Sequence, residues 1–253
     1  MKFTEYISTH QVFTTADLLA AADSASAAEQ QLGSAVRSGS VERVRRGLLV
    51  SNHGRYEEAP VDPYQLVSTA DPRVVLCYHS ALEAHGVAHN VGFECRFLSD
   101  VIHTPFAFRG MRYMPLGNVA ETPSALVRGS SLRRRATTRE RTILDCLASP
   151  GKAGGDEEAI RSVTAFAYID AAALVDAACG AGPSAASRVG WLLTEKANDW
   201  HVDPRLLQRL RAAIASGPYR LGRGMGEEHG FSAEWRLILP GRNEEVASWI
   251  TRA

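Results

Sequence analysis

The chain opens with apolar residues at helical spacing. Phe3, Tyr6 and Ile7 are spaced i, i+3, i+4, which predicts the inner face of a short helix. A second helix is predicted to follow Thr14 or Thr15, since either residue is a good N-cap for the apolar run behind it. This part of the chain therefore predicts two short helices.

A third helix is predicted between an N-cap at Ser24 or Ser26 and a stop at Gly39. Its apolar side carries Ala28, Leu32, Ala35 and Val36. Its opposite side carries Ser26, Gln30, Ser34 and Arg37. This polar side has no bulky apolar group, and it suits a major groove, where Gln can read adenine and Arg can read guanine or phosphate.

Two strand-like runs then flank a basic turn, Arg45-Arg46-Gly47, which predicts a β-hairpin. Three short helices followed by a basic hairpin predict a winged helix-turn-helix domain over residues 1–60. The wing arginines can contact phosphates or enter a minor groove. The candidate DNA-binding residues are Thr14, Thr15, Ser26, Gln30, Ser34, Arg37, Arg43, Arg45 and Arg46. A winged helix used only for protein contacts is the alternative.

The sequence of residues 61–253 predicts a second domain that contains both strands and helices. Strand-like runs are predicted at residues 74–78, 93–98, 111–114 and, late in the chain, 235–240. Helices are predicted to dominate from residue 124 onward, at residues 138–147, 156–166, 170–179, 184–195 and 204–215. The fold class predicted is α+β, with an N-terminal winged helix-turn-helix followed by a small sheet and a helical part.

The charge of the chain is neutral in total and uneven in distribution. Its 253 residues hold 28 basic and 28 acidic side chains, and 45% of them are hydrophobic, as in soluble globular proteins. Zero net charge excludes a uniformly basic nucleic-acid coat and leaves room for a local basic patch. Residues 37–55 hold five arginines and one glutamate, so the predicted helix end and wing carry +4.

A second basic patch lies between the predicted sheet and the helical part. Its members are Arg128, Arg133, Arg134, Arg135 and Arg139. They are candidates for contact with nucleic acid or with an acidic partner. The alternative is a solvated helix start or linker.

The compartment expected is the cytoplasm. The first thirteen residues have no apolar stretch or cleavage site of a signal peptide, and no segment has the length and polarity of a spanning helix. The four cysteines are widely spaced without a CxxC pair, which favours reduced thiols.

Signals for catalysis, metal or cofactor are weak. His85 and His89 are four residues apart but lack a second pair of ligands, so no metal site is expected. Glu94-Cys95-Arg96 faintly resembles a nuclease element whose metal-binding aspartate would be Asp71 or Asp62, but an arginine in the lysine position cannot act as a base. The Gly-rich segment 222–230 is expected to be a mobile loop rather than a phosphate-binding loop. The chain is expected to be no enzyme and to bind no cofactor.

Several motifs resemble the AbiEi-type antitoxins in order and spacing, across roughly residues 10–200. In the N-terminal part they are Val12-Phe13-Thr14-Thr15-Ala16-Asp17-Leu18, Ala35-Val36-Arg37-Ser38-Gly39 and Arg43-Val44-Arg45-Arg46-Gly47-Leu48. Further on they are His79-Ser80-Ala81-Leu82-Glu83-Ala84-His85-Gly86, Glu140-Arg141-Thr142-Ile143-Leu144-Asp145 and Arg188-Val189-Gly190-Trp191-Leu192-Leu193. The tail from residue 222 does not map onto the family pattern.

The resemblance implies a transcriptional autorepressor that is also an antitoxin. Proteins of this kind are encoded beside a nucleotidyltransferase-like toxin and repress the shared promoter, usually at inverted repeats, through the N-terminal winged helix. Their C-terminal domain is needed to neutralise the toxin, directly or indirectly. Two alternatives remain: a stand-alone winged-helix regulator whose C-terminal domain senses a ligand or partner, and a nuclease-like enzyme.

Overall fold

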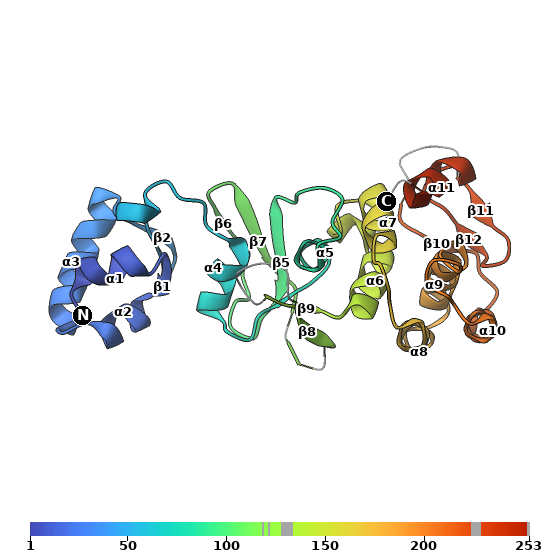
Figure 1. Ribbon diagram of the computed structural model, residues 1–253, viewed down its shortest axis with the longest axis horizontal. Helices are drawn as coiled ribbons and strands as arrows, with labels where there is room; N and C mark the ends of the chain where they lie inside the picture. The colour runs from blue at the N-terminus through green and yellow to red at the C-terminus, as the bar shows by residue number, and fades with distance from the viewer. Residues whose placement is uncertain (118, 121, 128–133, 224–228, 252–253) are drawn as a thin grey trace. The chain divides into compact units, whose positions relative to one another are not determined.

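The computed structural model describes residues 1–117, 119–120, 122–127, 134–223 and 229–251 (Figure 1). The chain forms two compact units. Unit 1 contains Met1–Val74 and Phe93–Ala120, and unit 2 contains Val75–Gly92 and Glu121–Ala253. The predicted α+β class with an N-terminal winged helix is confirmed.

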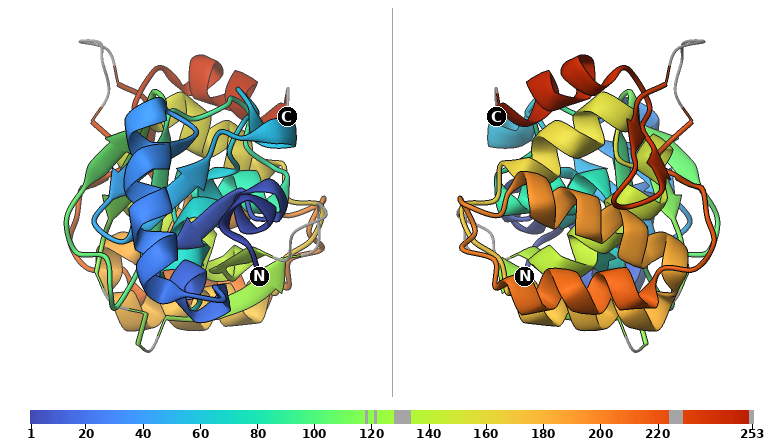
Figure 2. Two further views of the ribbon diagram at one scale, coloured as in Figure 1. Left: turned by 90° about the vertical axis from the view of Figure 1, so that its left-hand side faces the viewer. Right: turned by 90° about the vertical axis from the view of Figure 1, so that its right-hand side faces the viewer.

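The first part of unit 1 has the winged-helix order of elements. The elements are α1 (Phe3–Thr9), β1 (Val12–Thr14), α2 (Thr15–Ala21), α3 (Ala25–Ser38), β2 (Val41–Arg45) and β3 (Leu48–Ser51). A short 3-10 turn, η1 (Gly54–Tyr56), follows. The three strands form an antiparallel sheet in the order β1-β3-β2. Figure 2 shows α3 as the long blue helix of this domain.

The predicted caps explain where these helices begin and end. Thr14 and Asp17 form a capping box at the start of α2, in which Asp17 N–H donates to Thr14 Oγ1 (3.0 Å). Ser24 caps α3 by accepting from Ala27 N–H (3.4 Å). Gly39 ends α3 in the left-handed conformation, with φ of 80°. Local sequence signals therefore set the length of α3.

A single apolar core holds the winged helix together. It is built from the apolar positions of all three helices and of the sheet. These are Phe3, Tyr6, Ile7, Phe13, Leu18, Leu32, Ala35, Val41 and Leu49. The α1 residues predicted to face inward from their spacing are all buried.

The rest of unit 1 is one helix and three strands. They are α4 (Pro63–Ala70), β5 (Glu94–Leu98), β6 (Phe106–Phe108) and β7 (Met111–Pro115). β5 pairs with β7 in parallel, and β6 pairs with β7 antiparallel. Phe106 stacks on the buried Tyr113 with ring centroids 4.5 Å apart.

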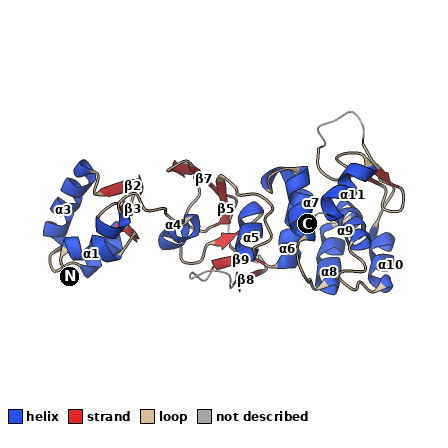
Figure 3. Ribbon diagram, turned by 45° about the horizontal axis from the view of Figure 1, so that its top comes forward, coloured by secondary structure: helices blue, strands red, loops and turns tan. Residues whose placement is uncertain are grey.

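Unit 2 combines several short strands with a helical body (Figure 3). Its first elements are β4 (Val75–Leu76), α5 (His79–His85), β8 (Ser124–Val127) and β9 (Arg134–Thr137). The body follows as α6 (Arg139–Ala148), η2 (Pro150–Lys152), α7 (Asp156–Thr164), α8 (Ala171–Ala181), α9 (Pro183–Glu195) and α10 (Pro204–Ala213). Last come β10 (Tyr219–Arg220), β11 (Phe231–Ser232), β12 (Leu237–Ile238) and α11 (Asn243–Thr251).

The core of unit 2 lies among these helices and the last small sheet, whose strand order is β10-β12-β11. Four tryptophans take part in it: Trp191, Trp200, Trp235 and Trp249. Trp200 Nε1 donates to the carbonyl of Phe166 (2.8 Å), which satisfies its one buried donor. The five predicted helices between residues 138 and 215 are all present, within a few residues of their expected ends.

Some expectations for unit 2 were wrong. Residues 124–127 and 134–137 are strands that pair antiparallel, whereas the sequence predicts no strand there and a dominance of helices from residue 124 onward. The run at 74–78 forms only the two-residue strand β4, because Tyr78 adopts a positive φ of 51° that ends an extended conformation. Helix α11 was not predicted. Across the described residues, no helix has the length and apolar character needed to cross a membrane.

Candidate nucleic-acid interface

Helix α3 presents the polar side that the sequence predicts. Ser26, Gln30 and Arg37 are exposed, while Ala28, Leu32 and Ala35 on the opposite side are buried. The small and apolar side of α3 thus packs on the core of the winged helix. The opposite side presents a serine, a glutamine and an arginine to solvent.

Arg37 lies back along the helix over Gly33. A Cβ atom at Gly33 would lie 3.6 Å from Nη1 of Arg37. Because Gly33 has no side chain, the guanidinium of Arg37 has room against the surface of α3. Ser34 is also exposed, but it lines a cavity of about 700 Å³ that runs toward α1 and includes Met1 and Lys2. Ser34 therefore lies at the edge of the polar side.

The wing is a tight turn between β2 and β3. Gly47 has a φ of 79°, which favours glycine, and its carbonyl accepts from Thr15 N–H (3.0 Å). This bond ties the wing to the first residue of α2. Arg43 and Arg46 are exposed and form no ion pair with any residue that the structure describes. They are therefore available to an anion outside the protein.

A β-bulge separates the wing arginines from one another. Arg43 lies opposite Leu49 and Arg45 lies opposite Leu48, so the register shifts between them. Arg45 is half-buried, with its guanidinium carbon 5.4 Å from the ring centroid of Phe106. Its Nη1 atom is buried and has no hydrogen-bond partner within the described part of the chain. Arg45 thus contacts β6, whereas the sequence alone grouped it with the DNA contacts.

The same side of the wing has a second contact with the β6–β7 hairpin. Arg109, in the turn between the two strands, forms an ion pair with Glu42 of β2 and donates through Nη1 to the carbonyl of Ala59 (2.8 Å). Glu42 and Arg109 are 67 residues apart, so no local pattern could indicate that they meet. Phe106 and Arg109 are positioning residues for the wing that sequence reasoning missed.

These contacts predict different results for two neighbouring arginines. If the exposed Arg46 contacts phosphate as the sequence predicts, Arg46→Ala is expected to weaken DNA binding and to lower the slope of log K against log salt by about one. Arg45→Ala is expected to leave this slope unchanged and to lower the free energy of unfolding by about 1 kcal/mol, through loss of the contact with Phe106. Salt-dependent fluorescence anisotropy and urea unfolding measure the two effects. Equal loss of slope in both variants would place Arg45 at a phosphate.

The two threonines among the candidates lie at the start of α2. Thr14 Oγ1 donates to Asp17 Oδ2 (2.6 Å) within the capping box. Thr15 is half-buried, and its N–H is held by the wing. Both residues therefore fix the entry to α2.

The arginines of the second basic patch lie in different surroundings. Arg128 and Arg133 lie outside the described residues. Arg134 and Arg135 are half-buried on β9, and Arg139 stacks on the exposed Tyr168, with its guanidinium carbon 3.9 Å from the ring centroid. The described arginines lie on a strand and at the start of α6, not on a solvated linker.

The carboxylates of the nuclease alternative have structural partners. Asp71 is buried and accepts from Ser99 Oγ (2.7 Å) and from Asp100 N–H (3.3 Å), which fixes the turn after β5. Glu94 forms ion pairs with Arg96 and Arg112. Within the described ranges, no three His, Cys, Asp or Glu side chains are grouped so that they could hold a metal ion.

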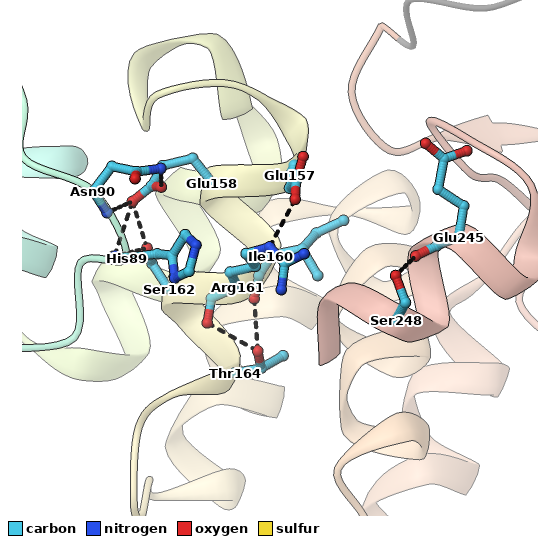
Figure 4. A network of polar contacts seen from close by, with 10 residues as sticks. All are labelled: His89, Asn90, Glu157, Glu158, Ile160, Arg161, Ser162, Thr164, Glu245 and Ser248. Carbon is cyan, nitrogen blue, oxygen red and sulfur yellow. Dashed lines mark hydrogen bonds and ion pairs between the residues drawn. The ribbon is translucent and has the colours of Figure 1, made fainter. Parts of the chain in front are cut away.

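A buried carboxylate, Glu158, accepts hydrogen bonds from the histidine-rich segment of unit 2 (Figure 4). Glu158 Oε1 accepts from His89 N–H (3.0 Å) and Ser162 Oγ (2.8 Å), and Oε2 accepts from the Asn90 side chain (2.6 Å). His79 Nε2 lies 3.3 Å from Oε1. Burial would raise the pKa of Glu158, but the hydrogen bonds from the Asn90 N–H (3.1 Å), from Ser162 and from the Asn90 side chain, together with His79, outweigh it and hold the pKa below its usual range. The network joins the loop after α5 to α7.

His85 makes a related contact at the end of α5. Its Nε2–H donates to the carbonyl of Thr137 (2.8 Å). Burial lowers the pKa of His85 and outweighs the opposing effect of this hydrogen bond. The folded state therefore favours the neutral imidazole.

The two shifts predict that unit 2 loses stability in acid. A group with a depressed folded pKa contributes stability above its unfolded pKa, and this contribution is lost as the pH falls. We expect the urea midpoint to fall first as the pH drops below about 6.5, through His85, and further below about 4.5, through Glu158. His85→Gln, which keeps a donor for Thr137, is expected to flatten the first step. His229→Gln, at an exposed site in unit 2, is the control, and equal flattening in both would exclude His85 as the cause.

Comparisons with known proteins agree with the N-terminal geometry. Residues 4–52 match the model of a family described as a transcriptional regulator, AbiEi antitoxin. The family resemblance is therefore confirmed for the winged helix. The rest of the chain lies outside this match.

One solved structure shares the fold over nearly the whole chain. The crystal structure of the RV2827C protein from Mycobacterium tuberculosis matches 99% of this chain and 92% of that chain, with a TM-score of 0.69 and 16% sequence identity. At this identity the likeness concerns the fold alone. No curated protein sequence matches the chain.

Proposed function

We propose that this protein is a DNA-binding autorepressor and the antitoxin of a two-gene system with a nucleotidyltransferase-like toxin. The observation that carries the proposal is the polar side of α3 beside a wing whose exposed arginines form no ion pair with any described residue, within a domain that matches the AbiEi regulator family. An arginine-bearing helix and wing of this kind bind duplex DNA through phosphates and base edges.

The surface divides into reading and supporting positions. Gln30 and Ser26 read base edges in the major groove, with Ser34 at the margin. Arg37, Arg43 and Arg46 bind phosphate, or guanine where α3 enters the groove. Thr14, Thr15 and Arg45 hold the helix entry and the wing in place. Residues 61–253, including the arginines near β9, carry the antitoxin function toward the toxin, and the protein acts in the cytoplasm.

The proposal is tested with the DNA fragment that lies upstream of the protein's own gene. Gel retardation is expected to show a complex with this fragment that survives a large excess of shuffled duplex. Gln30→Ala is expected to reduce the preference for the fragment over shuffled DNA by about 1–3 kcal/mol. Equal affinity for both duplexes in the unaltered protein would contradict a specific repressor.

The antitoxin role has a separate test. Co-expression with the adjacent reading frame is expected to restore growth that this frame alone arrests. A neighbour without nucleotidyltransferase character, or growth arrest that persists, would favour the alternative of a stand-alone winged-helix regulator whose C-terminal part senses a ligand or partner.

A further inference from the structure

Unit 2 contains a cavity with three cationic side chains on its wall. The cavity measures about 640 Å³, within the range of small-molecule sites. The cations are Lys152 of η2, Arg188 of α9 and Arg223 after β10. Its other lining residues are Ala148, Ser149, Pro150, Gly151, Gly155, Asp156 and Gly222.

Two of the cations, Lys152 and Arg188, are held in place by contacts other than ion pairs. The ammonium of Lys152 lies 5.0 Å from the ring centroid of Tyr78. Arg188 donates through Nε to the carbonyl of Arg220 (2.9 Å), which ties α9 to β10 and uses only one edge of the guanidinium. Both residues are half-buried, so their positions are restricted.

Arg223 is placed by its backbone. Its N–H donates to Asp156 Oδ2 (3.2 Å). Gly222 has a φ of 70°, and a Cβ atom there would lie 1.9 Å from Asp156 Oδ1. Only glycine permits this close approach, so Asp156 fixes the backbone while the Arg223 side chain remains exposed.

The charge balance of the cavity is positive. None of the three cations forms an ion pair with a carboxylate in the ranges that the structure describes. Among the described lining residues the carboxylate is Asp156, and it accepts from the backbone N–H of Arg223. Burial lowers the pKa of Arg188, because the charged guanidinium is partly removed from water. An anionic ligand would supply the missing interaction.

We propose that this cavity binds a small phosphorylated molecule. Arginine offers two parallel donors that match the oxygens of a phosphate, and lysine adds a compact charge. Gly151 and Gly155 carry no side chain, and a Cβ atom at either position would meet nothing within 4 Å, so a phosphate can approach the backbone closely there. The lining residues that the structure describes include no aromatic side chain, so the phosphate group rather than a stacked base supplies the recognition. The site adds a ligand-binding role to the DNA-binding role proposed above and does not depend on it.

The test uses the full chain and two probes, inorganic pyrophosphate and ADP. Isothermal titration in a phosphate-free buffer of low ionic strength is expected to show saturable binding of one molecule per chain for each probe. Adenosine is expected to give no heat of binding. Similar affinities for pyrophosphate and ADP indicate that the site reads phosphate alone, whereas tighter binding of ADP indicates a contact with the nucleoside as well.

Three variants connect binding to the cavity. Arg223→Gln and Arg188→Gln are each expected to weaken binding at least tenfold. Arg205→Gln removes the same charge from an exposed position outside the cavity wall and is expected to bind normally. Arg223 is exposed, so its replacement leaves the thermal midpoint unchanged and keeps the test valid if Arg188→Gln unfolds. Absence of saturable binding, unchanged affinity in Arg223→Gln, or equal weakening in Arg205→Gln would overturn the proposal.

Discussion

The triple variant R37A/R43A/R46A is expected to bind the chain's own promoter at least about 100-fold more weakly than the unaltered protein. These three arginines are exposed and have no carboxylate partner in the described part of unit 1. An arginine at phosphate or guanine contributes about 1–3 kcal/mol, so three lost contacts amount to two or more powers of ten. The slope of log K against log salt is expected to fall by about 0.9 for each lost phosphate contact.

Controls separate this effect from unfolding and from loss of the antitoxin role. All three side chains are exposed, so the thermal midpoint is expected to remain unchanged. Arg205→Ala provides a matched loss of charge in unit 2 and is expected to leave retardation intact. In the growth assay the triple variant is expected still to neutralise the toxin. Retardation at normal protein concentrations would show that α3 and the wing are not the DNA interface.

Much of the winged helix could be predicted because its signals are local. Thr14, Ser24 and Gly39 fix helix ends through contacts with residues at most a few positions away. The buried side of α3 follows from spacing alone, and so does the exposed side that is its complement. Spacing alone therefore predicts that the candidate reading residues Ser26, Gln30 and Arg37 lie on the surface, and in the structure they are exposed.

The orientation of the wing arginines could not be predicted in the same way. Whether Arg45 faces solvent depends on a bulge in β2 and on Phe106, which comes 61 residues later in the sequence. The strand at residues 134–137 is missed for a related reason. Its sequence, Arg-Arg-Ala-Thr, has weak strand character, and its conformation comes from pairing with β8 and β4. Non-local pairing determines both features.

The cavity of unit 2 shows the same limit for a candidate site. Lys152, Arg188 and Arg223 come from three segments of the chain that no motif connects. The sequence drew attention only to the Gly-rich segment at residues 222–230, of which residues 224–228 lie outside the described ranges. A binding site formed by separate segments requires the fold before its members can be grouped.

Replacement of Gly190 in α9 is expected to destabilise the protein strongly, whereas helix propensity alone predicts that alanine would stabilise it. A glycine inside a helix usually costs about 1 kcal/mol relative to alanine, so Gly→Ala is expected to stabilise α9 in isolation. Here a Cβ atom would lie 2.1 Å from Cζ3 of Trp235. Trp235 is fully buried and cannot move away, because its Nε1 donates to Thr194 Oγ1 (3.0 Å) and its carbonyl accepts from Ser187 Oγ (2.7 Å). Overpacking of about 1–3 kcal/mol therefore exceeds the gain in propensity.

We expect Gly190→Ala to lower the free energy of unfolding and Gly190→Val to lower it by about 3 kcal/mol or more, since a branched side chain adds two further atoms beside the ring. Gly180→Ala is the matched control, because a Cβ atom at this position in α8 meets nothing within 4 Å and is expected to stabilise by up to about 1 kcal/mol. Urea unfolding followed by tryptophan fluorescence measures all three variants. Adding Trp235→Leu to Gly190→Ala is expected to restore part of the loss, since the two changes share one contact and their effects do not add. If Gly190→Ala stabilised the protein as Gly180→Ala does, the close approach of α9 to Trp235 would be refuted.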